Sequence, residues 1–213
     1  MGYQPNLPLP SSLPAVPASG VGLKTMQIAA LAFQLQGNPF TSLANAQSKT
    51  VWDSLIAASD ATKIVMSPIT SATKISEGKR LETAVDSNAT FRGMPEYFGT
   101  GVAMISGEFH GLDAVTMAAL AAYADLSQLN PAASSIQLAA YFINEFGQII
   151  CQTDGSTYWG AITLNSFGLQ SRGTDGHASN DIVKWTAYLN PDWDSNVLAV
   201  IPTFNPLSYV VIL

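Results

Sequence analysis

The sequence has 213 residues, of which 47% are hydrophobic and only 11% are charged, and its formal net charge is -6. Ordinary soluble domains carry about 25% charged residues, so uncharged polar side chains or other protein copies must cover much of this surface. The mean hydropathy of +0.20 would suit a membrane protein, but the sequence contains no run of about 18 or more uncharged apolar residues. Composition therefore favours burial against protein over burial in lipid.

Charge is divided unevenly along the chain. Residues 93–213 hold ten acidic residues but only Arg172 and Lys184 as bases, whereas residues 1–92 hold seven of the nine Lys and Arg. An acidic surface repels nucleic-acid phosphates, which argues against sequence-specific nucleic-acid binding. The same charge suits a wall along which DNA slides without sticking, or a surface whose charge serves solubility alone.

The N-terminal stretch, residues 1–22, contains five prolines. Proline lacks the N–H donor that helices and sheets require, so we predict an extended arm here and a single domain over residues 23–213. Residues 1–20 lack the basic start and the uninterrupted apolar run of a secretory signal. We expect the arm to lie on a neighbouring subunit through its aliphatic side chains, Leu7, Leu9, Leu13 and Val16.

Two helices and a strand are predicted next. Residues 23–35 are good helix formers that end at a Gly-Asn-Pro stop, and residues 42–58 have apolar positions at helical spacing. Residues 61–66 are predicted as the first strand. Residues 71–91 mix Lys and Arg with Glu and Asp, which is typical of a long loop or an exposed hairpin.

The most apolar part of the chain lies between residues 99 and 151. Residues 102–109 predict a strand buried on both faces, and Asp113 is placed to cap a helix that is apolar nearly all round, and therefore buried. The expected buried stripe of that helix is Leu112, Val115, Ala119, Ala122 and Leu126. Residues 136–143 and 148–153 predict a hairpin, and Cys151 within it is expected to be a small core residue.

The last third of the chain predicts further strands. Residues 161–165 are expected to form one strand, followed by a loop over residues 166–180. Residues 181–189 alternate strictly, so Val183, Trp185, Ala187 and Leu189 should face the core. Residues 197–201 should return as the hairpin partner of that strand. The apolar end, residues 208–213, needs a sheet or a neighbour to cover it.

One loop offers a candidate for catalysis. Gly173-Thr174-Asp175-Gly176-His177 places an acid near an imidazole, and Asp175 would orient His177 as a general base. No nucleophile is marked, however, and the Gly-x-Ser-x-Gly motif is missing. Glycine-flanked Asp and His are also common turn residues, so we assign no catalytic residue.

Other chemistry has weaker signals. Glu108 and His110 would need a third ligand to hold a metal, and the acids Glu96, Glu108 and Glu145 form a glycosidase pair only if two of them converge. The aromatic residues Tyr158, Trp159, Trp185 and Trp193 would suit a sugar-stacking face, although strand aromatics are more often core. Neither a Walker motif nor a dinucleotide fingerprint occurs. We therefore predict no metal and no cofactor.

Two helices followed by seven or so strands, with one buried helix among them, predict an α+β fold built on a mainly antiparallel sheet or sandwich. The order of elements over residues 61–201, with its flanking helix, long polar loop and extended arms, resembles bacteriophage virion proteins, especially tail-tube-like subunits. That resemblance implies subunits stacked as rings around a DNA channel. The two N-terminal helices depart from this pattern, and the resemblance assigns no functional residue.

The sequence thus predicts a non-enzymatic structural subunit of a homo-oligomer, most specifically a phage tail-tube component. Its partners would be copies of itself and other virion proteins, with DNA only as passing cargo and no membrane. It would reside in the virion after assembly in the host cytoplasm. The alternatives are a capsid-associated minor virion protein, a carbohydrate-binding module, and a hydrolase that uses Asp175 and His177.

Overall fold

The computed structural model describes residues 27–82, 97–128, 137–173, 181–191 and 193–210. Within them the fold is mostly antiparallel β-sheet with few helices, which confirms the α+β prediction at that level. The strands are β1 (Ile28–Leu35), β2 (Val65–Met66), β3 (Thr70–Ser76), β4 (Arg80–Glu82), β5 (Tyr97–Thr100), β6 (Ala103–His110), β7 (Leu138–Asn144), β8 (Ile149–Thr153), β9 (Trp159–Gly160), β10 (Ile162–Leu169), β11 (Ile182–Leu189) and β12 (Val197–Val200). The helices are α1 (Leu43–Gln47), α2 (Lys49–Ala57), α3 (Ala114–Gln128) and the short 3-10 helix η2 (Pro206–Tyr209).

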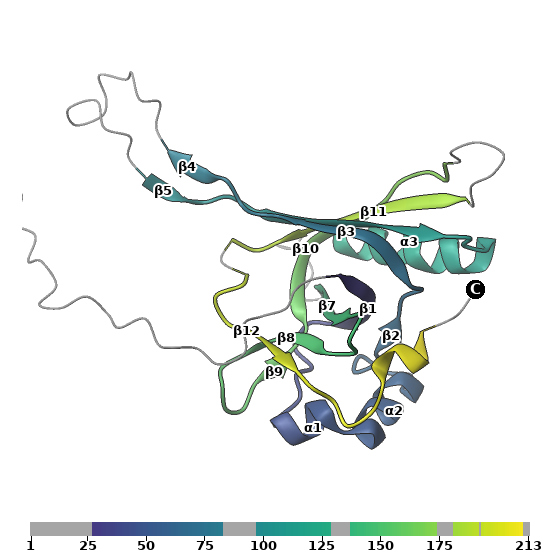
Figure 1. Ribbon diagram of the computed structural model, residues 1–213, viewed down its shortest axis with the longest axis vertical. Helices are drawn as coiled ribbons and strands as arrows, with labels where there is room; N and C mark the ends of the chain where they lie inside the picture. The colour runs from purple at the N-terminus through teal and green to yellow at the C-terminus, as the bar shows by residue number, and fades with distance from the viewer. Residues whose placement is uncertain (1–26, 83–96, 129–136, 174–180, 192, 211–213) are drawn as a thin grey trace, which may run out of the picture.

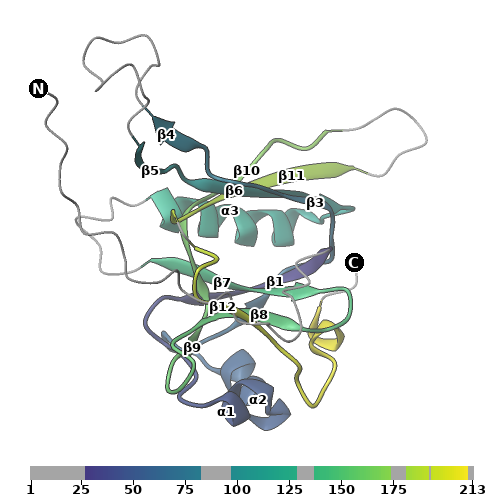
Figure 2. The ribbon, with the colours of Figure 1, turned by 60° about the vertical axis from the view of Figure 1, so that its left-hand side comes forward.

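The sheet bends at β10, which belongs to both of its halves. The start of β10 pairs with β7, and the rest of the strand pairs with β11 after a register shift between Leu164 and Ser166. The strand order is therefore β12-β8-β7-β10-β11-β6-β3, with β1 added beside β7. Figures 1 and 2 show the β3–β6–β11 half lying across the half that contains β1, β7 and β8.

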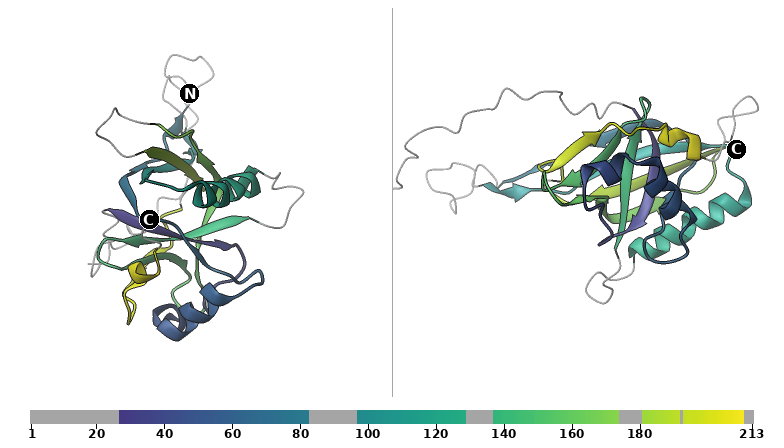
Figure 3. Two further views of the ribbon diagram at one scale, coloured as in Figure 1. Left: turned by 90° about the vertical axis from the view of Figure 1, so that its right-hand side faces the viewer. Right: turned by 90° about the horizontal axis from the view of Figure 1, so that it is seen from below.

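The larger core lies between these two halves. Phe33 and Phe142 enter it from one half, Phe109 and Trp185 enter it from the other, and Phe167 enters it from β10. Helix α3 packs mainly on β10, at one side of the two layers (Figure 3). Side chains from distant parts of the sequence thus share one apolar interior.

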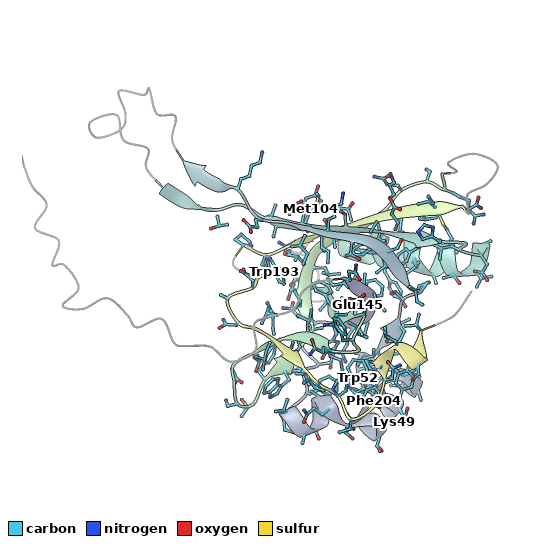
Figure 4. All side chains as sticks on the ribbon, viewed as in Figure 1. Lys49, Trp52, Met104, Glu145, Trp193 and Phe204 are labelled. Atoms are coloured by element: carbon cyan, nitrogen blue, oxygen red, sulfur yellow. The ribbon has the colours of Figure 1, made fainter. Side chains whose placement is uncertain are left out.

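A smaller core covers the opposite face of β1 and β7. Ala32 and Tyr141 point to it from the sheet, and Trp52 of α2 is fully buried against them. The indole Nε1 of Trp52 donates to the carbonyl oxygen of Ala46, at 2.9 Å, which ties α2 to α1. Figure 4 shows Trp52 beneath the sheet.

The helix predicted over residues 23–35 is wrong, because residues 28–35 form strand β1. This strand lies between the two cores, with Leu31 and Phe33 facing one and Ala30 and Ala32 facing the other. A strand covered on both faces has a continuous apolar sequence, and that sequence cannot be distinguished from a buried helix by its periodicity. The second predicted helix is confirmed as α1 and α2, which meet at Ser48.

Helix α3 begins as predicted, since the Asp113 carboxylate accepts from the Thr116 backbone N–H at 2.6 Å. It is not buried all round, however. Leu120 and Ala124 face the core, whereas the side chain of Val115 is 78% exposed and Ala119 and Ala122 are also exposed. The helix is apolar on its outer face because small alanines lie there, and apolarity alone does not reveal which side a sheet covers.

Strand burial follows two different patterns in the neighbouring strands β6 and β11. The prediction for β11 is confirmed, with Val183, Trp185, Ala187 and Leu189 all buried. Strand β6 is not buried on both faces as predicted, because Met104, Ser106 and Glu108 on its outer side are only half-buried. The outer face of this half of the sheet carries no further layer among the described residues.

Three boundaries differ from prediction. Strand β2 has only two residues, since Asp60 holds a turn by accepting from the Thr62 N–H at 2.9 Å. Strand β10 continues to Leu169, inside the predicted loop, because it pairs with β11. In the polar region over residues 71–91, β3 joins the main sheet, and β4 pairs with β5 as a two-stranded ribbon that projects from the body (Figure 1). Residues 83–91 lie outside the described part.

The pairing predicted for β12 is also wrong. Strand β12 pairs with β8 and not with β11. Strand β11 has no free edge, since β10 and β6 occupy its two sides. The predicted β7–β8 hairpin is confirmed, with the side chain of Asn144 accepting from the backbone N–H groups of Phe146 and Gln148 at 3.0 and 2.9 Å.

Replacing Trp185 by alanine should destabilise the protein by about 3–5 kcal/mol, because a fully buried indole and its hydrogen bond to Thr70 are lost. Tyr188→Ala is the matched control, since Tyr188 lies on the same strand and is 42% exposed. The measurement is denaturant unfolding of both variants. A similar loss of stability in the two would refute the assigned faces of β11.

Gly107→Ala should destabilise the fold by about 1–3 kcal/mol through overpacking. A Cβ at this position would lie 2.8 Å from the Trp185 ring and 2.7 Å from the Thr70 hydroxyl. The control is Gly168→Ala in β10, where the nearest heavy atom to a new Cβ is 4.0 Å away. Thermal unfolding should separate the two variants clearly; equal melting temperatures would contradict the close packing of Trp185 on β6.

Candidate functional site

An open groove of about 490 Å³, with a mixed polar and apolar lining, lies between the β7–β8 turn and the segment that follows β12. Two of its large side chains, Phe146 and Ile201, are 67% and 65% exposed. Glu145 and Phe204 come from its two walls (Figure 4). The other lining residues are Gly147, Pro202, Thr203, Asn205 and Leu207.

The first wall is the tight turn that joins β7 to β8. Asn144 is fully buried and accepts the two turn N–H groups described above, so the turn is held from inside. Gly147 has a φ of 73°, which glycine adopts without strain. This geometry leaves Phe146 pointing away from the core, where water contacts most of its ring.

The second wall is residues 201–210, here called the C-terminal strap. The side-chain amide of Gln47 donates to the Ile201 carbonyl at 2.9 Å, and the Thr203 N–H donates to the Gln47 carbonyl at 3.0 Å. The strap continues into η2, and Val210 at its end is buried. Within the predicted apolar end, Ser208 is exposed, Tyr209 is half-buried and Val210 is buried by its own chain. Residues 211–213 lie outside the described part, so the prediction that this end needs a sheet or a neighbour to cover it stays a prediction.

A charged cluster anchors the strap to α2. The Tyr209 hydroxyl donates to the Asp53 carboxylate, which also pairs with Lys49 at 2.8 Å. The hydrogen bond from Lys49, and then that from Tyr209, hold the pKa of Asp53 below its ordinary value. Exposed pairs of this kind add little to overall stability, but this one fixes the position of the groove wall.

The described chain starts beside the groove. The Glu145 backbone N–H donates to the Gln27 carbonyl at 3.1 Å, and the hydroxyl of Thr73 donates to the Ile28 carbonyl at 2.7 Å. Gln27 therefore sits between the β7–β8 turn and β3. Gln27, the first residue that the structure describes, is thus hydrogen-bonded to the turn that forms the first wall.

The uncovered outer face of β3, β6 and β11 is polar. Lys74 and Lys184 lie on it beside Glu108, with Lys184 Nζ 3.8 Å from a Glu108 carboxylate oxygen. Ser71 and His110 form a side-chain hydrogen bond of 2.6 Å on the same face. With two lysines beside one glutamate, this face is not the acidic wall that the charge distribution suggests.

The candidate catalytic loop lies almost wholly outside the described residues. Gly173 forms two backbone hydrogen bonds with Ile182, at 2.8 and 2.9 Å, which places the start of the loop beside β11. Residues 174–180 are not described, so the roles of Asp175 and His177 stay predictions.

The structure does not bring together the other predicted acids and ligands. Glu108 of β6 pairs with Lys184 of β11, whereas Glu145 lies in the β7–β8 turn of the opposite half. Glu96 lies outside the described residues. Across the described ranges, no group of three or more His, Cys, Asp and Glu is arranged to hold a metal. Nor is any helix there long and apolar enough to cross a membrane.

The sugar-stacking face is not formed. Trp159, Trp185 and Trp193 are all buried, and Trp185 packs between Phe109 and Phe167. Cys151 is buried as predicted, and burial raises the pKa of its thiol to about 12, which leaves it unreactive at neutral pH.

Comparison with protein-family models, curated proteins and solved structures found no match for this chain. The sequence analysis did not predict the groove. Its only signals there are an aromatic residue inside a turn, Phe146, and the apolar pair Ile201-Pro202 after a strand.

Asp53→Asn should loosen the strap, and its effect should depend on pH. Because the pKa of Asp53 is lowered in the folded state, its contribution to stability is present above the unfolded value near 3.8 and is lost as the pH falls through the folded pKa. The wild type should therefore have a larger free energy of unfolding than Asp53→Asn at pH 7. This difference in free energy should shrink below about pH 4. Urea unfolding from pH 7 to strongly acidic pH measures this; a constant difference would contradict it.

Proposed function

We propose that this protein is a structural subunit of a homo-oligomeric assembly. The supporting observation is the amount of apolar surface on a chain with only 11% charged residues. The exposed large hydrophobic side chains in the described part are Leu43, Ile69, Val102, Val115, Phe146, Tyr188, Leu198 and Ile201. Because so few charges repel neighbouring molecules, this exposed apolar surface favours contact between copies.

The most specific form of the proposal is a component of a bacteriophage tail tube. A mainly antiparallel body, a flanking helix and the projecting β4–β5 ribbon support it. We further propose that the two facing halves of the one sheet act as the two layers of a sandwich. In this proposal the subunit resides in the virion, after assembly in the host cytoplasm. Its partners are further copies and other virion proteins, and DNA passes as cargo without being read.

The other functional classes have less support. A carbohydrate-binding module that uses its tryptophans would need them exposed, but Trp52, Trp159, Trp185 and Trp193 are all buried. A hydrolase would depend on Asp175 and His177, which lie outside the described residues. A capsid-associated minor virion protein belongs to the same structural class and differs in the shape of the assembly.

The purified protein should form oligomers whose fraction rises with concentration. Light scattering measures the mass, and negative-stain microscopy should show rings or tubes. Removal of residues 1–22 should weaken assembly without changing the circular dichroism of the body. A wild-type protein that stays monomeric over a wide range of concentration would contradict the proposal, and closed shells would favour the capsid-associated alternative.

A further inference from the structure

Hydrogen bonds within the body hold both walls of the groove. The Asn144 side chain holds the turn that carries Phe146, and Gln47 holds the strap at Ile201 and Thr203. Because both walls are fixed by bonds within the body, the groove does not need an occupant in order to form. Phe146 and Ile201 are therefore presented side by side with polar groups at a preformed site.

The predicted N-terminal arm has the composition that such a groove accepts. Residues 1–22 contain no charged side chain, five prolines and several leucines. Proline-rich segments bind aromatic-lined grooves because their extended backbone loses little entropy on docking. The groove supplies Phe146 and Phe204 together with Pro202 and Leu207 for this contact.

The length of the arm favours docking on another copy. At about 3.1 Å per residue, 22 extended residues span roughly 70 Å. A body of about 190 residues has a radius of gyration of only about 16 Å. An extended segment of that length is long enough to reach the groove of a neighbouring copy.

We propose that residues 1–22 of one copy dock in the groove of a neighbouring copy, with the arm leucines packed against Phe146 and Phe204. This inference rests on the proposed assembly and names the surface that mediates it. Each copy then donates one arm and accepts another, so the contact is heterologous. Repetition of a heterologous contact gives a ring or an open helical array.

Disulfide trapping in the full chain tests this contact. One preparation carries Leu9→Cys or Leu13→Cys, and the other carries Phe146→Cys with a size tag, so that mixed dimers are resolved on a non-reducing gel. The native Cys151 is buried and should not compete. Val115→Cys is the control partner, because Val115 is even more exposed, at 78%, but lies on α3.

The arm variants should cross-link to Phe146→Cys roughly a hundredfold more than to Val115→Cys, since docking raises the effective concentration of the thiols. Equal or absent cross-linking in a protein that still assembles would overturn the docking site and leave the proposed function standing. Cross-links found only within one chain of a double variant would overturn docking between copies. A monomeric wild type without cross-links would remove both proposals.

Discussion

The bend of the sheet at β10 is the constraint on which the rest of the described structure depends. The strand pairs with β7 at its start and with β11 beyond it, so one chain segment holds both halves of the sheet. The register shift near Leu164 changes the direction of the strand, as bulges do. Phe33 and Phe142 are thereby brought opposite Phe109 and Trp185. Without this bend, the apolar faces of the two halves would have no common interior.

Two neighbouring residues allow Trp185 to fit inside this interior. Gly107 lies opposite it in register, and its missing side chain leaves room for the indole. The indole Nε1 donates to the Thr70 hydroxyl at 2.8 Å, which satisfies a polar group inside the core. A strand pair, a glycine and one hydrogen bond therefore act together at the centre of the β3–β6–β11 half.

The proposed role in assembly rests on exposed apolar side chains and not on a catalytic site. The β1–β7–β8 half carries α1 and α2 on its far side, and these helices in turn hold the C-terminal strap through Gln47 and Asp53. The groove is thus a consequence of how the smaller core is covered. It leaves Phe146 and Ile201 exposed, and Gln27 is hydrogen-bonded to Glu145 in the turn that carries Phe146. Apolar exposure in a fixed place is more consistent with a contact between subunits than with a solvated surface.

Local patterns in the sequence predicted several elements correctly. The alternation in β11, the Asp113 cap and the turn at Asn144 each depend on interactions between residues close in the chain. The strand β1 was missed because its pairing with β7 joins residues more than a hundred positions apart. The partner of β12 was missed because it depends on which sheet edge is free.

The groove could not be predicted for the same reason, since its walls come from a turn and a strap about fifty residues apart, and their meeting is set by tertiary packing. The exposed side of α3 was also missed, because alanines are compatible with either burial or exposure.

Hydrogen–deuterium exchange at low and high protein concentration tests the central claim most directly, because it reports which backbone becomes covered when copies meet. The account predicts that exchange in the β7–β8 turn and in the strap slows as concentration rises, while β6 and β11 keep the same protection throughout. Identical exchange of the turn and strap at all concentrations would contradict the claim that this surface is covered by another copy.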